Sequence, residues 1–274
     1  MYQQHWQLRA RPFENWTDEK FYYPAEGHQT ALLKLRYALE HRRSVSLLCA
    51  ECGIGKSILI DQLSRQLPDS LQPFIRVAYP LLPRDQLLAW IADEFSGQRC
   101  ETHESERESL RRIETFLRNS QEAKHHPVLV IDEAHLLNAA ESLESLRLLL
   151  NLAQPVTQAE SAWSLVLIGQ PSLLGNVERC RALEERVSVK CIVPRFSLEQ
   201  TAAYVQHRLR CAGGTSEKIF SADAIEKLHA RGSGIPRRIN RLADLALMIG
   251  YAEDLSQIDS PQIEGVHDEL LAVH

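Results

Sequence analysis

The chain has 274 residues, of which 44% are hydrophobic and 24% charged, and its formal net charge is −5. These values are typical of a soluble globular protein with one large or two small domains. The negative charge gives no general electrostatic reason to bind nucleic acid or an anionic membrane, and no stretch approaches the roughly 20 apolar residues of a membrane span.

The N-terminal region shows no secretion signal, because residues 1–23 are aromatic and charged and lack an apolar segment. Six cysteines are scattered along the chain, and only Cys49 and Cys52 lie close together. This spacing argues against a zinc site and favours free thiols in a reducing compartment. We therefore expect a cytoplasmic protein without a membrane span.

Residues 1–26 are expected to be extended or irregular, because Pro12 and Pro24 interrupt them. A helix is predicted over residues 27–41, where alanine and leucine recur on one face. Both segments are assigned to the first domain.

The most informative stretch runs from Ser44 to Leu63, where a short apolar run, a glycine-containing turn and an amphipathic run follow without a gap. This order predicts a strand, a loop and a helix. The loop fits the phosphate-binding pattern G-x-x-x-x-G-K-[ST] at every position except the first, where Ala50 replaces glycine. The predicted nucleotide-binding residues of the loop are Ala50, Glu51, Cys52, Gly53, Ile54, Gly55, Lys56, Ser57 and Ile58.

The chemistry of phosphate binding explains this spacing. Gly53 and Gly55 let the backbone approach phosphate oxygens and direct its N–H groups toward them. Lys56 is expected to reach the β- and γ-phosphates, and the Ser57 hydroxyl is expected to bind Mg²⁺. The competing interpretation is a glycine-rich turn before a surface helix, with an incidental Lys-Ser pair.

A second informative stretch reads PVLVIDEAHLL from Pro127 to Leu137. Its apolar residues Val128 to Ile131 predict a strand that is buried on both faces, with Asp132 and Glu133 at its carboxyl end. Ligands bind at this edge in open parallel sheets. Asp132 is predicted to hold Mg²⁺ and Glu133 to polarise the attacking water. The alternative is that the two carboxylates only cap the following helix.

The remaining pattern alternates strands and helices up to Pro194 and contains only helices after it. Such alternation predicts a parallel sheet covered by helices on both faces. Gln170 is expected at the carboxyl end of one of its strands. Further strands are predicted over 74–78, 164–168 and 188–193, and helices over 84–95, 106–119, 139–152, 198–211, 221–231, 236–251 and 261–273, with Ser197 and Ser221 as N-caps.

Taken together, these stretches resemble the AAA+ ATPases, and within them the general secretion pathway protein A (ExeA-like) family. The order and spacing of the motifs match over nearly the whole chain. The matching stretches are PF and FYYP with His28 near the N-terminus, GxGK[ST] at Gly53 to Ser57, VIDEAH at Val130 to His135, LIGQPSL at Leu167 to Leu173, LEERV at Leu183 to Val187, YVQHRL at Tyr204 to Leu209 and GIPRRIN at Gly234 to Asn240.

The resemblance implies a P-loop NTPase fold with a five-stranded parallel sheet and a C-terminal helical lid, in domains of residues 1–195 and 196–274. It implies ATP and Mg²⁺ as cofactors and a homo-oligomer. Gln170 is then expected to sense the γ-phosphate and Arg237 to reach the nucleotide from the lid. Arg186 is expected to enter a neighbouring subunit's site as an arginine finger, with Arg179 and Arg181 as rivals.

The function that these features favour is an ATP-hydrolysing motor or switch of the kind used in secretion or pilus assembly. The alternative is a DNA-associated AAA+ ATPase of the transposition or replication-loader type, which the net charge does not favour. A third interpretation, a nucleotide-binding scaffold with degraded catalysis, rests only on Ala50. The DNA alternative rests on the cluster Arg231, Arg237, Arg238 and Arg241.

Overall fold

The computed structural model describes residues 2–14, 19–99, 104–137, 139–153 and 160–272. Contacts divide the chain into two compact units. We call Thr30–Glu51 with Leu59–Val193 the sheet unit. Met1–Gln29, Cys52–Ile58 and Pro194–His274 form the helical unit.

The sheet unit is built on five parallel strands, as predicted. Their order is β2-β3-β4-β1-β5, and every neighbouring pair is parallel. The central strands β1, β3 and β4 are buried along their whole length, which explains their unbroken apolar sequences. The strands are β1 (Val45–Cys49), β2 (Phe74–Val77), β3 (Val128–Ile131), β4 (Ser164–Gly169) and β5 (Val187–Ile192).

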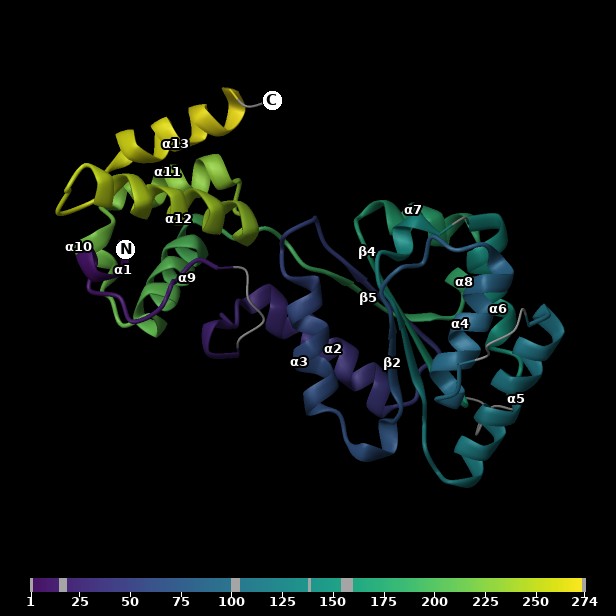
Figure 1. Ribbon diagram of the computed structural model, residues 1–274. Helices are drawn as coiled ribbons and strands as arrows, with labels where there is room; N and C mark the ends of the chain where they lie inside the picture. The colour runs from purple at the N-terminus through teal and green to yellow at the C-terminus, as the bar shows by residue number, and fades with distance from the viewer. Residues whose placement is uncertain (1, 15–18, 100–103, 138, 154–159, 273–274) are drawn as a thin grey trace. The chain divides into compact units, whose positions relative to one another are not determined.

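Helices cover both faces of this sheet. The sheet unit includes α2 from Thr30 onward and α3 from Leu59 onward. These two helices lie on one face of the sheet, and α4, α5 and α6 lie on the other (Figure 1). The core between them includes Trp163, which is fully buried. The helices are α2 (Glu26–Glu40), α3 (Lys56–Gln66), α4 (Arg84–Ser96), α5 (Glu106–Glu122), α6 (Glu144–Leu149), α7 (Ser172–Arg179) and α8 (Arg181–Glu184).

The helix predicted over 139–152 forms from Ala139 to Leu149, but its first turn is not α-helical. A π-helical turn at Ala139–Leu143 leads directly into the short α6. The Ser145 hydroxyl donates a hydrogen bond to the carbonyl of Glu141 at 2.7 Å. Such a bond to the preceding turn competes with regular helix geometry and bends helices, and a leucine pattern alone does not report it.

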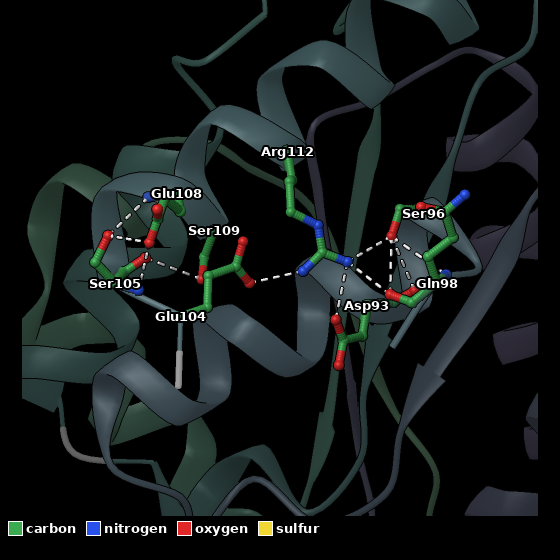
Figure 2. A network of polar contacts seen from close by, with 8 residues as sticks. All are labelled: Asp93, Ser96, Gln98, Glu104, Ser105, Glu108, Ser109 and Arg112. Atoms are coloured by element: carbon green, nitrogen blue, oxygen red, sulfur yellow. Dashed lines mark hydrogen bonds and ion pairs between the residues drawn. The ribbon is translucent and has the colours of Figure 1, made fainter. Parts of the chain in front are cut away.

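Helices α4 and α5 are tied together by Arg112, as Figure 2 shows. Its guanidinium donates to the carboxylates of Asp93 at 2.9 Å and Glu104 at 2.6 Å. It also donates to the Ser96 hydroxyl at 2.7 Å and to the carbonyl of Gln98 at 2.6 Å. One side chain therefore joins the end of α4 to the start of α5.

The start of α5 carries its own cap, also drawn in Figure 2. Ser105 and Glu108 form a reciprocal capping box, in which each side chain bonds the other residue's backbone N–H. The hydrogen bonds from Ser105 hold the pKa of the Glu108 carboxyl below its usual value. The cap fixes the start of α5, directly after Glu104, whose carboxylate Arg112 binds.

We expect Arg112→Ala to destabilise the protein by about 1–2 kcal/mol, because several charge-assisted hydrogen bonds are lost at a partly exposed site. Thermal unfolding followed by circular dichroism should show a lower midpoint. Arg118→Ala, which removes an exposed arginine of the same helix, is the control. Equal midpoints for the two variants would show that the contacts of Arg112 contribute nothing measurable.

The helical unit contains the four predicted C-terminal helices. Ser197 and Ser221 accept hydrogen bonds from the backbone N–H groups of Gln200 and Ala224, which confirms both predicted N-caps. An additional short helix, α10, lies between α9 and α11. The helices are α9 (Leu198–Cys211), α10 (Ser216–Ile219), α11 (Ala222–Gly232), α12 (Pro236–Ala252) and α13 (Ser260–Ala272).

The N-terminal residues pack with these helices. Short turns α1 (Tyr2–His5) and η1 (Glu19–Phe21) interrupt the segment that was expected to be irregular. The indole of Trp6 donates to the carbonyl of Leu247 at 2.9 Å, and Phe13, 2% exposed, packs edge-on against Phe220. The described residues among 2–29 thus group with the helical unit. The predicted domains, residues 1–195 and 196–274, stay a prediction.

Candidate functional site

Residues Cys52–Ile58 of the predicted phosphate loop lie in the helical unit, and geometry requires both glycines of this stretch. Gly53 has a φ of 86° and Gly55 a φ of 114°, values that residues with a side chain rarely adopt. A Cβ on Gly53 would stand 2.8 Å from the Cβ of Arg237, too close for real atoms. Both the backbone conformation and the close packing therefore demand glycine at this position.

Helix α3 begins directly after the loop, at Lys56. Lys56 is only 8% exposed, whereas Ser57 is exposed. The free N–H groups and the positive dipole end of a helix favour an anion at its N-terminus. The loop and the helix start together have the features expected of a phosphate site.

Arg237, near the start of α12, contacts the loop. Its backbone N–H donates to the carbonyl of Gly53 at 3.2 Å, and its guanidinium donates to the sulfur of Cys52 at 3.6 Å. The residue predicted to act from the lid is therefore adjacent to the predicted loop, although its role toward nucleotide stays a prediction.

His28 is a residue at this loop for which the sequence suggested no role. Its Nε2 atom lies 3.0 Å from the carbonyl oxygen of Ile54, and the side chain is buried. The two residues are 26 positions apart in the chain, so no local pattern reveals the contact. His28 was visible only as one position of the N-terminal motif.

Ala50, the departure from the loop pattern, lies at the end of β1 in the sheet unit. Its backbone N–H donates to the carbonyl of Gly169 at 3.1 Å, which continues the pairing of β1 with β4. Ala50 is not among the described residues with a positive φ. An alanine is therefore compatible with this backbone.

Asp132 follows β3 in the sheet unit and is 7% exposed. One carboxylate oxygen accepts the backbone N–H of Glu133 at 2.9 Å, and the other is bonded by the guanidinium of Arg76. Arg76 also pairs with Asp61 of α3 at 3.2 Å. Arg76 was not predicted as a site residue, because its only signal in the sequence is one charged residue within the four-residue strand β2.

Glu133 has a strained backbone. Its φ of 48° and ψ of 32° lie in the left-handed region, which is uncommon for glutamate. Its carboxylate lies 3.3 Å from Nδ1 of His135. Unusual backbone geometry of this kind concentrates at functional sites.

Gln170 follows β4, which lies between β3 and β1 in the sheet. Because the strands are parallel, Gln170 and Asp132 are both at the carboxyl edge. Gly169 before it is closely packed, since an added Cβ would stand 3.0 Å from the backbone nitrogen of His135. The structure thus brings two of the predicted residues to the same edge.

The three candidate finger arginines lie in the sheet unit. Arg186 donates to the side-chain oxygen of Asn151 at 2.7 Å, and Arg179 donates to Asn176 at 2.5 Å. Arg181 and Arg179 are exposed, whereas Arg186 is partly buried. The choice among the three stays a prediction.

The donor set limits the metal chemistry. Within the described ranges, no three histidine, cysteine or acidic residues come together as a metal site. No disulfide bond joins any two of the five cysteines in those ranges. Among the described helices, none is both long and apolar enough to cross a bilayer.

Comparison with solved structures identifies the fold. The chain superposes on the Aeropyrum pernix ORC2 protein with a TM-score of 0.65 and 14% sequence identity, and the match covers 94% of this chain and 71% of that one. The Aeropyrum pernix ORC1 protein in complex with DNA gives 0.67 and 16%, covering 96% and 69%. The Thermotoga maritima RuvB Holliday junction branch migration motor gives 0.58 and 18%, covering 89% and 68%. At these identities the likeness concerns the fold alone, that of P-loop AAA+ proteins.

Sequence comparison identifies relatives. The AAA domain family matches residues 39–176. General secretion pathway protein A of Aeromonas hydrophila is 32% identical over 286 aligned positions, which cover 98% of this chain and 50% of the relative. The chain thus spans about half the length of that relative. The chain belongs to the AAA family of P-loop ATPases and is related to general secretion pathway protein A.

Proposed function

We propose that the chain binds ATP with Mg²⁺, hydrolyses it, and works as an oligomeric motor or switch in the cytoplasm. The observation that carries the proposal is the phosphate loop. Gly53 and Gly55 are both in left-handed conformations, and Lys56 starts a helix directly after them. These features favour binding of a polyphosphate by backbone N–H groups and one ammonium group.

Each further residue has a proposed role. Lys56 binds the β- and γ-phosphates, and Arg237 reaches the nucleotide from its place against Gly53. Glu133 is the proposed base that orients the attacking water, and Gln170 senses the γ-phosphate from the same sheet edge.

Asp132 and Ser57 supply the proposed oxygen ligands for Mg²⁺. When bound, this ion neutralises developing charge on the phosphate oxygens. Arg76 already bonds the Asp132 carboxylate, so metal binding has to share or displace that contact. Carboxylate and hydroxyl oxygens are nonetheless the ligands that Mg²⁺ prefers, and the residues fit the ion.

The cellular setting is taken from the relative. General secretion pathway protein A is 32% identical to this chain, and that similarity supports a role in secretion. Pilus assembly is the other setting that the sequence predicts. The role proposed for Arg186, an arginine finger that acts on a neighbouring subunit's nucleotide, requires an assembly of several copies.

Association with DNA is the second candidate. One solved structure of the same fold is an ORC1 protein in complex with DNA, and Arg231, Arg238 and Arg241 are exposed on α11 and α12. Against this, Arg231 lies 3.8 Å from the carboxylate of Glu264, and the net charge of the chain is −5. We therefore favour the motor or switch.

The direct test of the proposed function is Lys56→Ala. We expect affinity for a fluorescent ATP analogue to fall about 10- to 100-fold, because a charge-assisted hydrogen bond at a buried position is lost. Lys34→Ala, at an exposed position of α2, is the matched control and should bind normally. Wild-type protein that binds no ATP, or a Lys56→Ala variant that binds as well as wild type, would contradict the proposal.

A further inference from the structure

The contact between His28 and the phosphate loop stands apart from every proposed catalytic role. His28 lies in the first turn of α2 and is 5% exposed. Its Nε2 atom is 3.0 Å from the Ile54 carbonyl oxygen, and a Cβ on Gly55 would stand 3.3 Å from the same nitrogen. The imidazole ring packs edge-on against Phe196, with ring centroids 5.9 Å apart. The side chain is thus held between the loop and the start of the lid.

The partner atom determines the tautomer of His28. A carbonyl oxygen only accepts hydrogen bonds, so Nε2 carries the proton and donates it. Burial lowers the pKa of His28, and the ring is therefore neutral near pH 7. Its Nδ1 atom is buried and has no hydrogen-bond partner among the described residues. The whole polar contribution of the ring is directed at Ile54.

The orientation of one carbonyl determines the orientation of the next N–H. In a planar trans peptide unit, the carbonyl of Ile54 and the N–H of Gly55 point in opposite directions. A carbonyl turned toward His28 therefore turns the Gly55 N–H away from it. A carbonyl that faced a bound phosphate would instead repel it.

We propose that His28 is a positioning residue, which holds the Ile54–Gly55 peptide in the orientation that presents the Gly55 N–H to phosphate. The inference rests on the proposed function for the identity of the ligand, a nucleoside polyphosphate. It assigns the N-terminal segment a part in nucleotide binding, through one hydrogen bond.

The test compares His28→Ala with His28→Gln. A glutamine amide nitrogen can occupy the place of Nε2 and donate the same hydrogen bond. With fluorescent ADP as the probe, we expect His28→Ala to weaken binding about 3- to 10-fold, which corresponds to the loss of one hydrogen bond. His28→Gln should recover most of this affinity. In ATP turnover, KM should rise in His28→Ala more than kcat falls.

His126 provides the matched control. It is also a buried histidine, 1% exposed, with Nε2 2.8 Å from the hydroxyl of Ser164, but it lies in the sheet unit. Burial lowers the pKa of His126 to about 4. His126→Ala should lower the thermal midpoint and leave ADP affinity unchanged, so it separates general destabilisation from a specific effect on the loop.

A second measurement works without nucleotide. Deuterium uptake of peptides covering residues 50–58 should increase in His28→Ala and return toward wild type in His28→Gln. ADP affinity in His28→Ala equal to wild type would overturn the proposal, as would a His28→Gln variant that binds as weakly as His28→Ala. If wild type binds no nucleotide, the proposed function fails, and deuterium uptake alone then decides whether His28 holds the loop.

Discussion

Replacing Glu133 by glutamine is expected to lower kcat for ATP hydrolysis by about 10²- to 10⁴-fold, the range typical of a lost general base. Glutamine has nearly the same shape but cannot take a proton from the attacking water. ATP affinity should stay at the wild-type level, because the proposed phosphate-binding groups are on the loop. Steady-state phosphate release and equilibrium binding of a fluorescent ATP analogue measure the two quantities separately.

The control for this variant is Glu114→Gln, which makes the same chemical change at an exposed position of α5. It should hydrolyse ATP at the wild-type rate. If Glu133→Gln retained its turnover, another residue would have to activate the water. If it lost ATP binding as well as turnover, Glu133 would have a role in binding or folding instead.

The second large effect is expected at Arg186. Loss of an arginine finger costs about 10³- to 10⁵-fold in rate in well-studied systems, and we expect a loss of this order for Arg186→Ala. The bond from Arg186 to Asn151 at 2.7 Å lies within one chain, and its loss alone predicts only a small change in stability. In Arg186→Ala, ATP turnover should therefore fall strongly, whereas the thermal midpoint should change little.

Mixing experiments test whether Arg186 acts between subunits. A Glu133→Gln subunit retains its finger, and an Arg186→Ala subunit retains its base, so mixed assemblies should recover activity that neither variant has alone. Arg179→Ala and Arg181→Ala, measured in parallel, identify the finger among the three. Full activity of Arg186→Ala together with a loss in one of the other two would reassign the role.

The strands could be predicted because the local order of apolar and polar residues indicates which faces of an element are buried. The apolar run Val128–Ile131 is a fully buried strand, as expected. Local pattern does not report partners. The indole of Trp6 bonds the carbonyl of Leu247, 241 positions along the chain, and nothing in the sequence near either residue reveals this contact.

The candidate site shows the same limit. Glycine spacing located a loop whose two glycines have positive φ, and motif order pointed to Arg237, which contacts Gly53. The contacts of His28 and Arg76 could not be predicted, because their partners Ile54 and Asp132 are 26 and 56 positions away. A motif identifies residues that recur in a fixed local order, whereas supporting contacts come from tertiary folding.

The left-handed backbone at Glu133 has an evolutionary consequence. A non-glycine residue in this region costs about 1–3 kcal/mol, and glycine or asparagine would relieve most of it. Selection for thermal stability alone should therefore replace Glu133. The selected variants should be more stable but should lack the proposed ATP hydrolysis. At this position stability and activity favour different amino acids, so the glutamate should persist only while selection acts on the activity.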